Sequence, residues 1–186
     1  PSCFHFADAY SMAGEILHIG KLFPQFFCKK YFTNFYNAKD DFYPQWVIGA
    51  EMVMRTQEAK AIGGFSTEYY MYTEDMDLCK KVDSLLKKNI YYLANVSLIH
   101  LGGASEAQNF NYNKQEKLIQ NDMIFIKKFY GENEVQKALK NMNRAYRLRL
   151  RLLKYFYYRT DRNLQIDKTK KVIDIIKEIR NDYCSR

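Results

Sequence analysis

Three carboxylates gather where a helix is predicted to begin, and this cluster is the part of the sequence best suited to chemistry. Glu74, Asp75 and Asp77 follow Thr73, a residue that can cap a helix. The positive end of the helix dipole favours the ionised form of a carboxylate. Such a carboxylate, held on a rigid helix end, can accept the proton of an attacking hydroxyl. Acids in a first turn more often only complement the dipole, and spacing alone favours that role.

Two other side chains have both a structural and a chemical interpretation. His100 ends a predicted strand before Gly102 and Gly103; a single histidine there is more often structural than a metal ligand, and no second ligand lies nearby. Trp46, the only tryptophan, is by default a core anchor, and its alternative role is a stacking platform for a sugar. The four cysteines are scattered without a CxxC pair, which indicates reduced thiols rather than metal ligands.

The elements that must position these residues alternate in type before residue 112. Helices are predicted over 7–22, over a short aromatic stretch through Phe27 and Tyr31, over 56–62 up to Gly63 and Gly64, and over 73–88. Strands are predicted over 46–54, 90–93 and 96–100. The pattern predicts a mixed α/β part, residues 1–112.

Beyond Tyr112 the apolar residues recur at helical spacing only. Three stripes predict three helices: Leu118, Ile119, Met123, Ile126 and Tyr130; Leu139, Met142, Tyr146, Leu150, Leu153 and Tyr157; Val172, Ile176, Ile179 and Tyr183. This helical extension, residues 113–186, holds 19 Lys/Arg against 9 Asp/Glu, whereas residues 1–112 hold 10 against 12. The two parts therefore differ in charge as well as in structure.

The segment from Gly63 to Cys79, GGFSTEYYMYTEDMDLC, carries a family resemblance together with IGA before it and LIHLGGAS after it. These blocks, in this order, resemble family-2 glycosyltransferases of the rhamnosyltransferase-like group. The resemblance covers roughly a third of the chain, and it is specific because several separate blocks agree. It implies that Asp75, the second residue of the Glu-Asp pair, is the catalytic base. Ser66, where the group usually carries aspartate, and Glu51 are departures that leave the acceptor's identity open.

The resemblance implies the fold and the remaining site residues. We expect an α/β fold, the C-terminal, acceptor-binding part of a Rossmann-like GT-A domain, followed by the α-helical extension. The N-terminal nucleotide-binding half would be absent, so we expect negligible transferase activity from these residues alone. Trp46, Glu74 and Asp77 become acceptor-binding candidates, with structural support an equal alternative for Glu74 and Asp77. His100 becomes a ligand of a divalent metal, Mg or Mn, in the full-length enzyme, and the fragment would not retain that metal.

The implied function is an inverting glycosyltransferase of bacterial polysaccharide synthesis. A nucleotide-sugar would be its donor, and a glycan or lipid-linked molecule its acceptor. The alternative is a non-enzymatic module that binds a membrane or nucleic acid through its basic tail. No stretch of the sequence reads as a membrane span or signal peptide, so a cytoplasmic protein, at most on the inner face of the plasma membrane, is expected.

The basic tail, residues 137–162, has nine Lys/Arg and one acid, with five aromatics interleaved. In order of preference it predicts a packed helix, an amphipathic helix on an anionic bilayer, and a nucleic-acid-binding helix. No nucleic-acid-binding motif supports the last, so nucleic acid is not expected as a partner. The helical extension is also a candidate surface for a homodimer.

Overall fold

A computed structural model describes residues 3–19, 40–69, 71–99 and 112–184 of the chain. The chain divides into two compact units. The first is drawn from residues 1–6 and 20–111, and the second from residues 7–19 and 112–186. The N-terminal helix thus belongs with the C-terminal helices, although the sequence boundary near residue 112 groups it with the first part.

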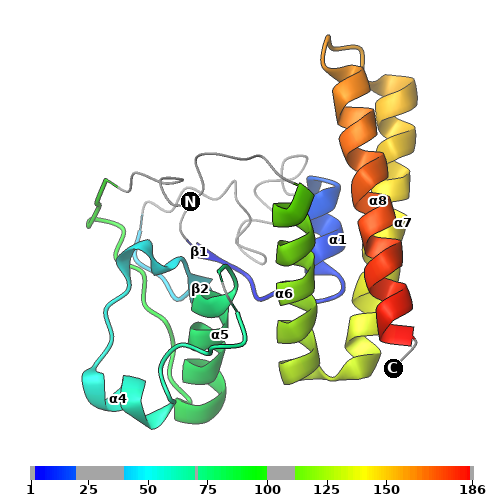
Figure 1. The fold of residues 1–186 in the computed structure, drawn as a ribbon. Helices are drawn as coiled ribbons and strands as arrows, with labels where there is room; N and C mark the ends of the chain where they lie inside the picture. Colours follow the sequence, from blue (N-terminus) through cyan, green and yellow to red (C-terminus); the bar gives the residue numbers. More distant parts are fainter. Residues whose placement is uncertain (1–2, 20–39, 70, 100–111, 185–186) are drawn as a thin grey trace. The chain divides into compact units, whose positions relative to one another are not determined.

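The described residues of the second unit form four helices, which Figure 1 labels. They are α1 (Ser11–Ile16), α6 (Tyr112–Tyr130), α7 (Glu132–Phe156) and α8 (Arg162–Cys184). Helices α7 and α8 lie side by side as a long hairpin, while α6 packs on both and α1 packs on α7. The three helices predicted beyond Tyr112 are confirmed. The helix predicted over 7–22 is shorter among the described residues.

The core of this unit is made by the apolar stripes that the sequence contains. Each of the three long helices turns its stripe inward, because one buried face per helix removes the most apolar surface from water. The buried stripe residues are Ile119, Met123, Ile126, Leu139, Met142, Leu153, Val172, Ile176 and Ile179. Burial is dense along the first half of α7 and sparse near its end, where Leu153 alone is buried after Ala145.

Two side chains of α7 bond to a backbone carbonyl just before α1 and to one at its end. Asn141 Nδ2 donates to Ala9 O at 3.0 Å, and Arg149 Nη1 donates to Ile16 O at 3.1 Å. A cation at the end of a helix satisfies a carbonyl that has no partner within the helix and complements the negative end of the dipole. These bonds explain why a helix of only six residues is held in place.

The described residues of the first unit contain little regular structure. Strands β1 (Cys3–Phe4) and β2 (Trp46–Val47) pair antiparallel, with Phe4 opposite Trp46. A 3₁₀ turn, η1 (Gly49–Glu51), follows β2, and then come α4 (Thr56–Ala61), α5 (Glu74–Lys81) and a π-helical turn, η2 (Val82–Leu86). Helix α4 confirms the helix predicted over 56–62. Helix α5 with η2 confirms the helix predicted from Thr73.

A small apolar cluster holds α4, α5 and η2 together. Ile62 at the end of α4, Leu78 within α5 and Val82 at the start of η2 are buried in it. Four partly buried side chains close it: Met52, Met54, Leu86 and Ile90. The segment that bears the carboxylates is therefore anchored through the apolar face of α5.

The predicted α/β fold, a part of a GT-A domain, is wrong. Of the described residues, 64% lie in helices and 3% in strands. The strand predicted over 46–54 stops at Val47, because Asp75 takes the Gly49 N–H that a strand ladder would need. Over 90–99 a single bridge, between Phe42 and Tyr92, replaces the two predicted strands. Apolar residues favour a strand only where a neighbouring strand is available to pair with it.

Two glycines of the second unit make a matched test of its backbone. Gly131, between α6 and α7, has φ +88° and ψ 170°, a conformation that side chains resist. Gly131→Ala should lower the free energy of unfolding by about 1–3 kcal/mol. Gly14→Ala should raise it by up to about 1 kcal/mol, because Gly14 is helical and its added Cβ meets nothing within 4 Å. Thermal melts followed by far-UV circular dichroism measure both, and equal effects would contradict the assigned backbone at Gly131.

Candidate functional site

The carboxylate of Asp75 is held at the start of α5 by two backbone amides. Gly49 N–H donates to Asp75 Oδ2 at 3.0 Å, and Met76 N–H donates to Oδ1 at 2.8 Å. The contact with Gly49 crosses 26 residues of sequence and joins the first turn of α5 to the end of β2. Asp75 is half-buried. One carboxylate thus connects the two elements that the sequence analysis placed at the site.

Burial raises the pKa of Asp75, and the hydrogen bonds from Gly49 and Met76 offset part of that rise. Loss of water disfavours the charged form of the carboxylate, and amide donors favour it. A carboxylate with a raised pKa is a stronger base once it is ionised. Asp75 therefore has the electrostatic character of a proton acceptor rather than that of a solvated surface acid.

The backbone just before α5 is strained. Tyr72 and Thr73 have φ values of 70° and 73°, in the left-handed region that non-glycine residues rarely adopt. Thr73 occupies the N-cap position, as expected, but makes no side-chain cap bond to the helix. Two consecutive residues of this kind cost roughly 1–3 kcal/mol each, and such strain collects at functional sites. The double turn sets the direction in which α5, and with it Asp75, enters the fold.

Asp77 lies in the interior of the first unit. Its side chain is fully buried, and it accepts hydrogen bonds from Ser66 Oγ at 2.6 Å and from Tyr69 OH at 3.1 Å. These bonds connect α5 to the loop that follows Gly63 and Gly64. Of the two roles considered for Asp77, the structure favours bracing the loop over contacting an acceptor.

Lys81, one helical turn after Asp77, completes a clamp on the same loop. Its Nζ donates to Gly64 O at 2.6 Å and to Ser66 Oγ at 3.0 Å, and it lies 3.6 Å from Asp77 Oδ2. Sequence reasoning missed Lys81, Tyr69 and the function of Ser66. The i, i+4 spacing of Asp77 and Lys81 was the available signal, since it places opposite charges on one helix face.

Ser66 fits this clamp by being both donor and acceptor. Its hydroxyl donates to Asp77 and accepts from Lys81. An aspartate in its place would put a second carboxylate against Asp77, which raises the energy of both ionised groups. The departure from the family pattern at Ser66 is therefore explained by packing within this chain.

Glu74 has a carboxylate oxygen that is buried without a partner. Among the described residues nothing forms a hydrogen bond with Glu74 Oε2, although solvent does not reach that atom. Buried acceptors are nearly always satisfied, so an exception next to Asp75 calls for an explanation. A hydroxyl group of a bound molecule would supply the missing donor.

Trp46 is engaged within the first unit. Its Nε1–H donates to His5 O at 2.7 Å, and its ring stacks on Phe4 with centroids 4.5 Å apart. Both contacts tie β2 to β1. The structure thus gives Trp46 the anchoring role that is the default for a lone tryptophan, and it commits one ring face and the N–H to that role.

Metal and thiol chemistry have little support in the part of the chain that the structure describes. No group of three or more His, Cys, Asp or Glu side chains there is placed to hold a metal ion, and His100 lies outside the described residues. Cys79 is buried, and burial raises the pKa of its thiol to about 11. That thiol stays protonated near neutral pH, which makes it a poor nucleophile.

Comparisons with known proteins identify no relative of this chain. No protein-family model, no curated protein and no solved structure matches it. Among the described helices, none is both long enough and apolar enough to cross a bilayer.

The clamp predicts a large difference between two aspartates of the α5–η2 segment, Asp77 and Asp83. Asp77→Ala leaves Lys81 buried without its partner, so it should lower the free energy of unfolding by about 3–5 kcal/mol. Asp83→Ala removes an exposed ion pair with Lys80 and should change it by less than about 1 kcal/mol. Urea unfolding followed by the fluorescence of Trp46, which lies in this unit, measures both. Similar values for the two variants would show that the clamp does not stabilise the unit.

The raised pKa of Asp75 predicts a pH-dependent stability. Because the folded chain binds this proton more tightly than the unfolded chain, Asp75 favours folding less as the pH rises through its folded pKa. The stability of Asp75→Asn relative to the unchanged chain should therefore increase between about pH 4 and pH 7. Urea unfolding at each pH, read from Trp46 fluorescence, gives the difference. A difference that is constant over this range would show that Asp75 is not desolvated.

Proposed function

We propose that this chain carries the general base of an inverting glycosyltransferase and that the base is Asp75. The observation that carries the proposal is a half-buried carboxylate with a raised pKa, fixed between the end of β2 and the start of α5. The resemblance of the Gly63–Cys79 blocks to rhamnosyltransferase-like enzymes supports it. The proposal concerns the site and its chemistry, and it does not depend on the fold that the sequence suggested.

The step requires one proton acceptor that is placed before the substrate arrives. An acceptor hydroxyl oxygen attacks the anomeric carbon of a nucleotide-sugar and forms the new glycosidic bond. The bond from that carbon to the diphosphate oxygen breaks, and the nucleoside diphosphate leaves with the electron pair. The hydroxyl proton moves to Asp75. Because attack and departure occur on opposite faces of the sugar, the configuration inverts.

Glu74 supports the proposal from the acceptor side. Its buried Oε2 lacks a hydrogen-bond donor among the described residues, and it belongs to the residue adjacent to Asp75. A sugar, which carries several hydroxyls, can donate one to Glu74 while another is deprotonated. We assign Glu74 to acceptor binding and Asp77 to holding the loop.

No step of this proposal passes through a metal ion. The described residues form no metal-binding group, and His100, the ligand that the resemblance implies, lies outside them. Asp75 and Glu74 can bind and deprotonate a hydroxyl without one. Residues other than Asp75 and Glu74 would stabilise the leaving diphosphate.

The direct test is sugar transfer by the complete encoded protein that contains these residues. Asp75→Asn should lower kcat by about 100- to 10,000-fold, because it removes the proton acceptor while keeping the side chain's shape. Affinity for the nucleotide-sugar should change little. Release of nucleoside diphosphate, with a panel of nucleotide-sugars and saccharide acceptors, measures the rate.

Asp83→Asn is the matched control, because it removes a carboxylate from the same helical segment at an exposed position. Its kcat should stay within about twofold of the unchanged protein. Equal turnover in Asp75→Asn and Asp83→Asn would contradict the assignment of the base. Transfer with retained anomeric configuration would contradict the mechanism.

A further inference from the structure

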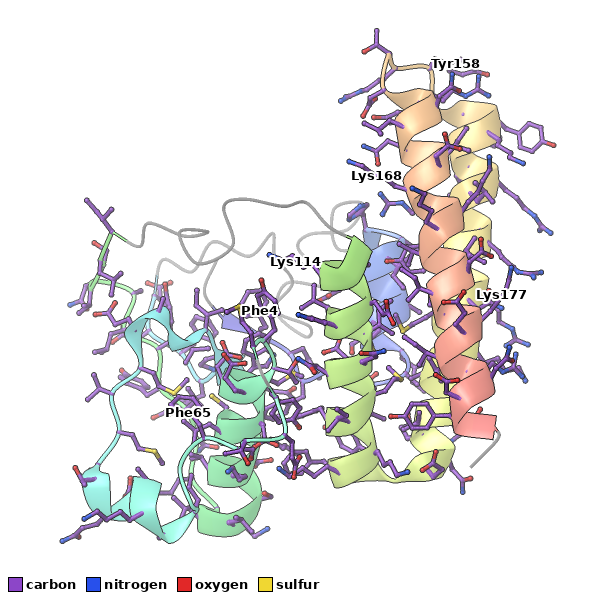
Figure 2. The ribbon with its side chains drawn as sticks, viewed as in Figure 1. Phe4, Phe65, Lys114, Tyr158, Lys168 and Lys177 are labelled. Atoms are coloured by element: carbon purple, nitrogen blue, oxygen red, sulfur yellow. The ribbon has the colours of Figure 1, made fainter. Side chains whose placement is uncertain are left out.

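The end of the α7–α8 hairpin exposes an unusual number of large apolar side chains. Between residues 148 and 164 six such residues are at least 44% exposed: Leu148, Leu152, Tyr155, Phe156, Tyr158 and Leu164. Tyr158 lies at the connection between the two helices, which extends past α1 and α6 within this unit (Figure 2). A soluble surface rarely groups large apolar side chains in this way unless something covers them.

The exposed side of α7 is divided into two parallel stripes. Leu148, Leu152 and Tyr155 are spaced i, i+4, i+7 and form an apolar stripe. Arg147, Arg151 and Lys154 have the same spacing and form a basic stripe beside it. Residues at these intervals share one helix face, so each stripe is continuous. The buried residue Leu153 lies on the opposite, core-facing side.

The cations of the basic stripe are not used by the fold. Arg147, Arg151 and Lys154 have no ion-pair or hydrogen-bond partner among the described residues, and they line an open groove against α8. Lys170 and Lys177 line its other wall and are paired with Asp167 at 3.1 Å and Asp174 at 2.7 Å. Lys177 is visible along α8 in Figure 2. The unneutralised charge of the groove is thus on α7.

Hydrogen bonds within the hairpin end hold its backbone in place, so its exposed side chains lie on an ordered surface. Arg162 donates to the carbonyls of Leu153 and Lys154, which closes the end of α7. Asp161 accepts from Tyr157 OH at 2.9 Å and from Gln165 Nε2 at 3.0 Å. These bonds fix the connection between the helices.

We propose that the end of the α7–α8 hairpin binds the surface of an anionic lipid membrane. The basic stripe would meet the lipid phosphates, and the apolar stripe with Phe156 and Tyr158 would enter the boundary between headgroups and acyl chains. The positive charge of the basic stripe favours an anionic partner. The leucines of the apolar stripe favour lipid over nucleic acid, because aliphatic side chains neither stack on bases nor contact phosphates favourably.

Vesicle co-sedimentation of the 186-residue chain tests the proposal. Vesicles of phosphatidylcholine mixed with phosphatidylglycerol should bind the chain, and vesicles of phosphatidylcholine alone should bind it far more weakly. The triple variant R147Q/R151Q/K154Q should lose on the order of 100-fold in affinity for the anionic vesicles, since each cation near such a surface contributes severalfold. Y155S/F156S should lose about tenfold or more.

The matched control removes the same charge elsewhere. R55Q/K60Q/K87Q deletes three exposed cations of the first unit and should bind anionic vesicles within about twofold of the unchanged chain. Far-UV circular dichroism verifies that each variant keeps its helices. An equal loss of affinity in the control and in R147Q/R151Q/K154Q would overturn the proposal, because total charge rather than this surface would then drive binding.

Tryptophan quenching reports insertion directly. Phe156→Trp places an indole at the hairpin end, and brominated phospholipid should quench it while the unchanged chain, with Trp46 alone, stays unquenched. No quenching at position 156 would overturn the proposal. So would tighter binding to a duplex oligonucleotide than to anionic vesicles at the same salt concentration, which would assign the basic stripe to nucleic acid.

Discussion

The buried pair of Asp77 and Lys81 is the interaction on which the proposed site depends. These residues lie one turn apart on α5, and together they take four contacts from the loop that begins at Gly64. A buried ion pair stabilises a structure only if hydrogen bonds satisfy the remaining polar atoms, and here Ser66 and Tyr69 do so. With α5 fixed in this way, Asp75 stays in reach of Gly49 and partly out of water. The pair thus supports both the loop's conformation and the placement of Asp75.

The start of α5 carries several destabilising features that a purely structural helix start would not need. Asp75 is partly desolvated, Glu74 keeps a buried oxygen that has no partner among the described residues, and Tyr72 and Thr73 adopt left-handed backbone conformations. Each of these features lowers stability, and proteins retain such features where binding or catalysis benefits from them. Their coincidence within four residues favours a functional site over dipole complementation. The basic hairpin end is a separate surface, supported by different residues.

The sequence was sufficient for some elements and not for others, for physical reasons. The helices after Tyr112 follow from stripes of apolar residues, since a helix determines its own buried face locally. The strand predicted from Trp46 failed because a strand needs a partner, and the Gly49 amide is bound by Asp75 instead. Asp75 is singled out by the resemblance of the surrounding sequence blocks, because its place at a helix start alone favours a structural role. Ser66 and Tyr69 could not be singled out, because their bonds to Asp77 depend on how the loop folds back.

The protonation of Asp75 is the quantity that the account rests on most directly. A carboxyl ¹³C nuclear magnetic resonance titration of the folded chain, with the Asp75 signal assigned by its loss in Asp75→Asn, measures it. We expect the pKa of Asp75 to lie above the ordinary aspartate value, because burial outweighs the backbone hydrogen bonds that lower it. A pKa at or below the ordinary value would mean that the carboxylate is well solvated or fully stabilised, and it would contradict the role of Asp75 as a poised base.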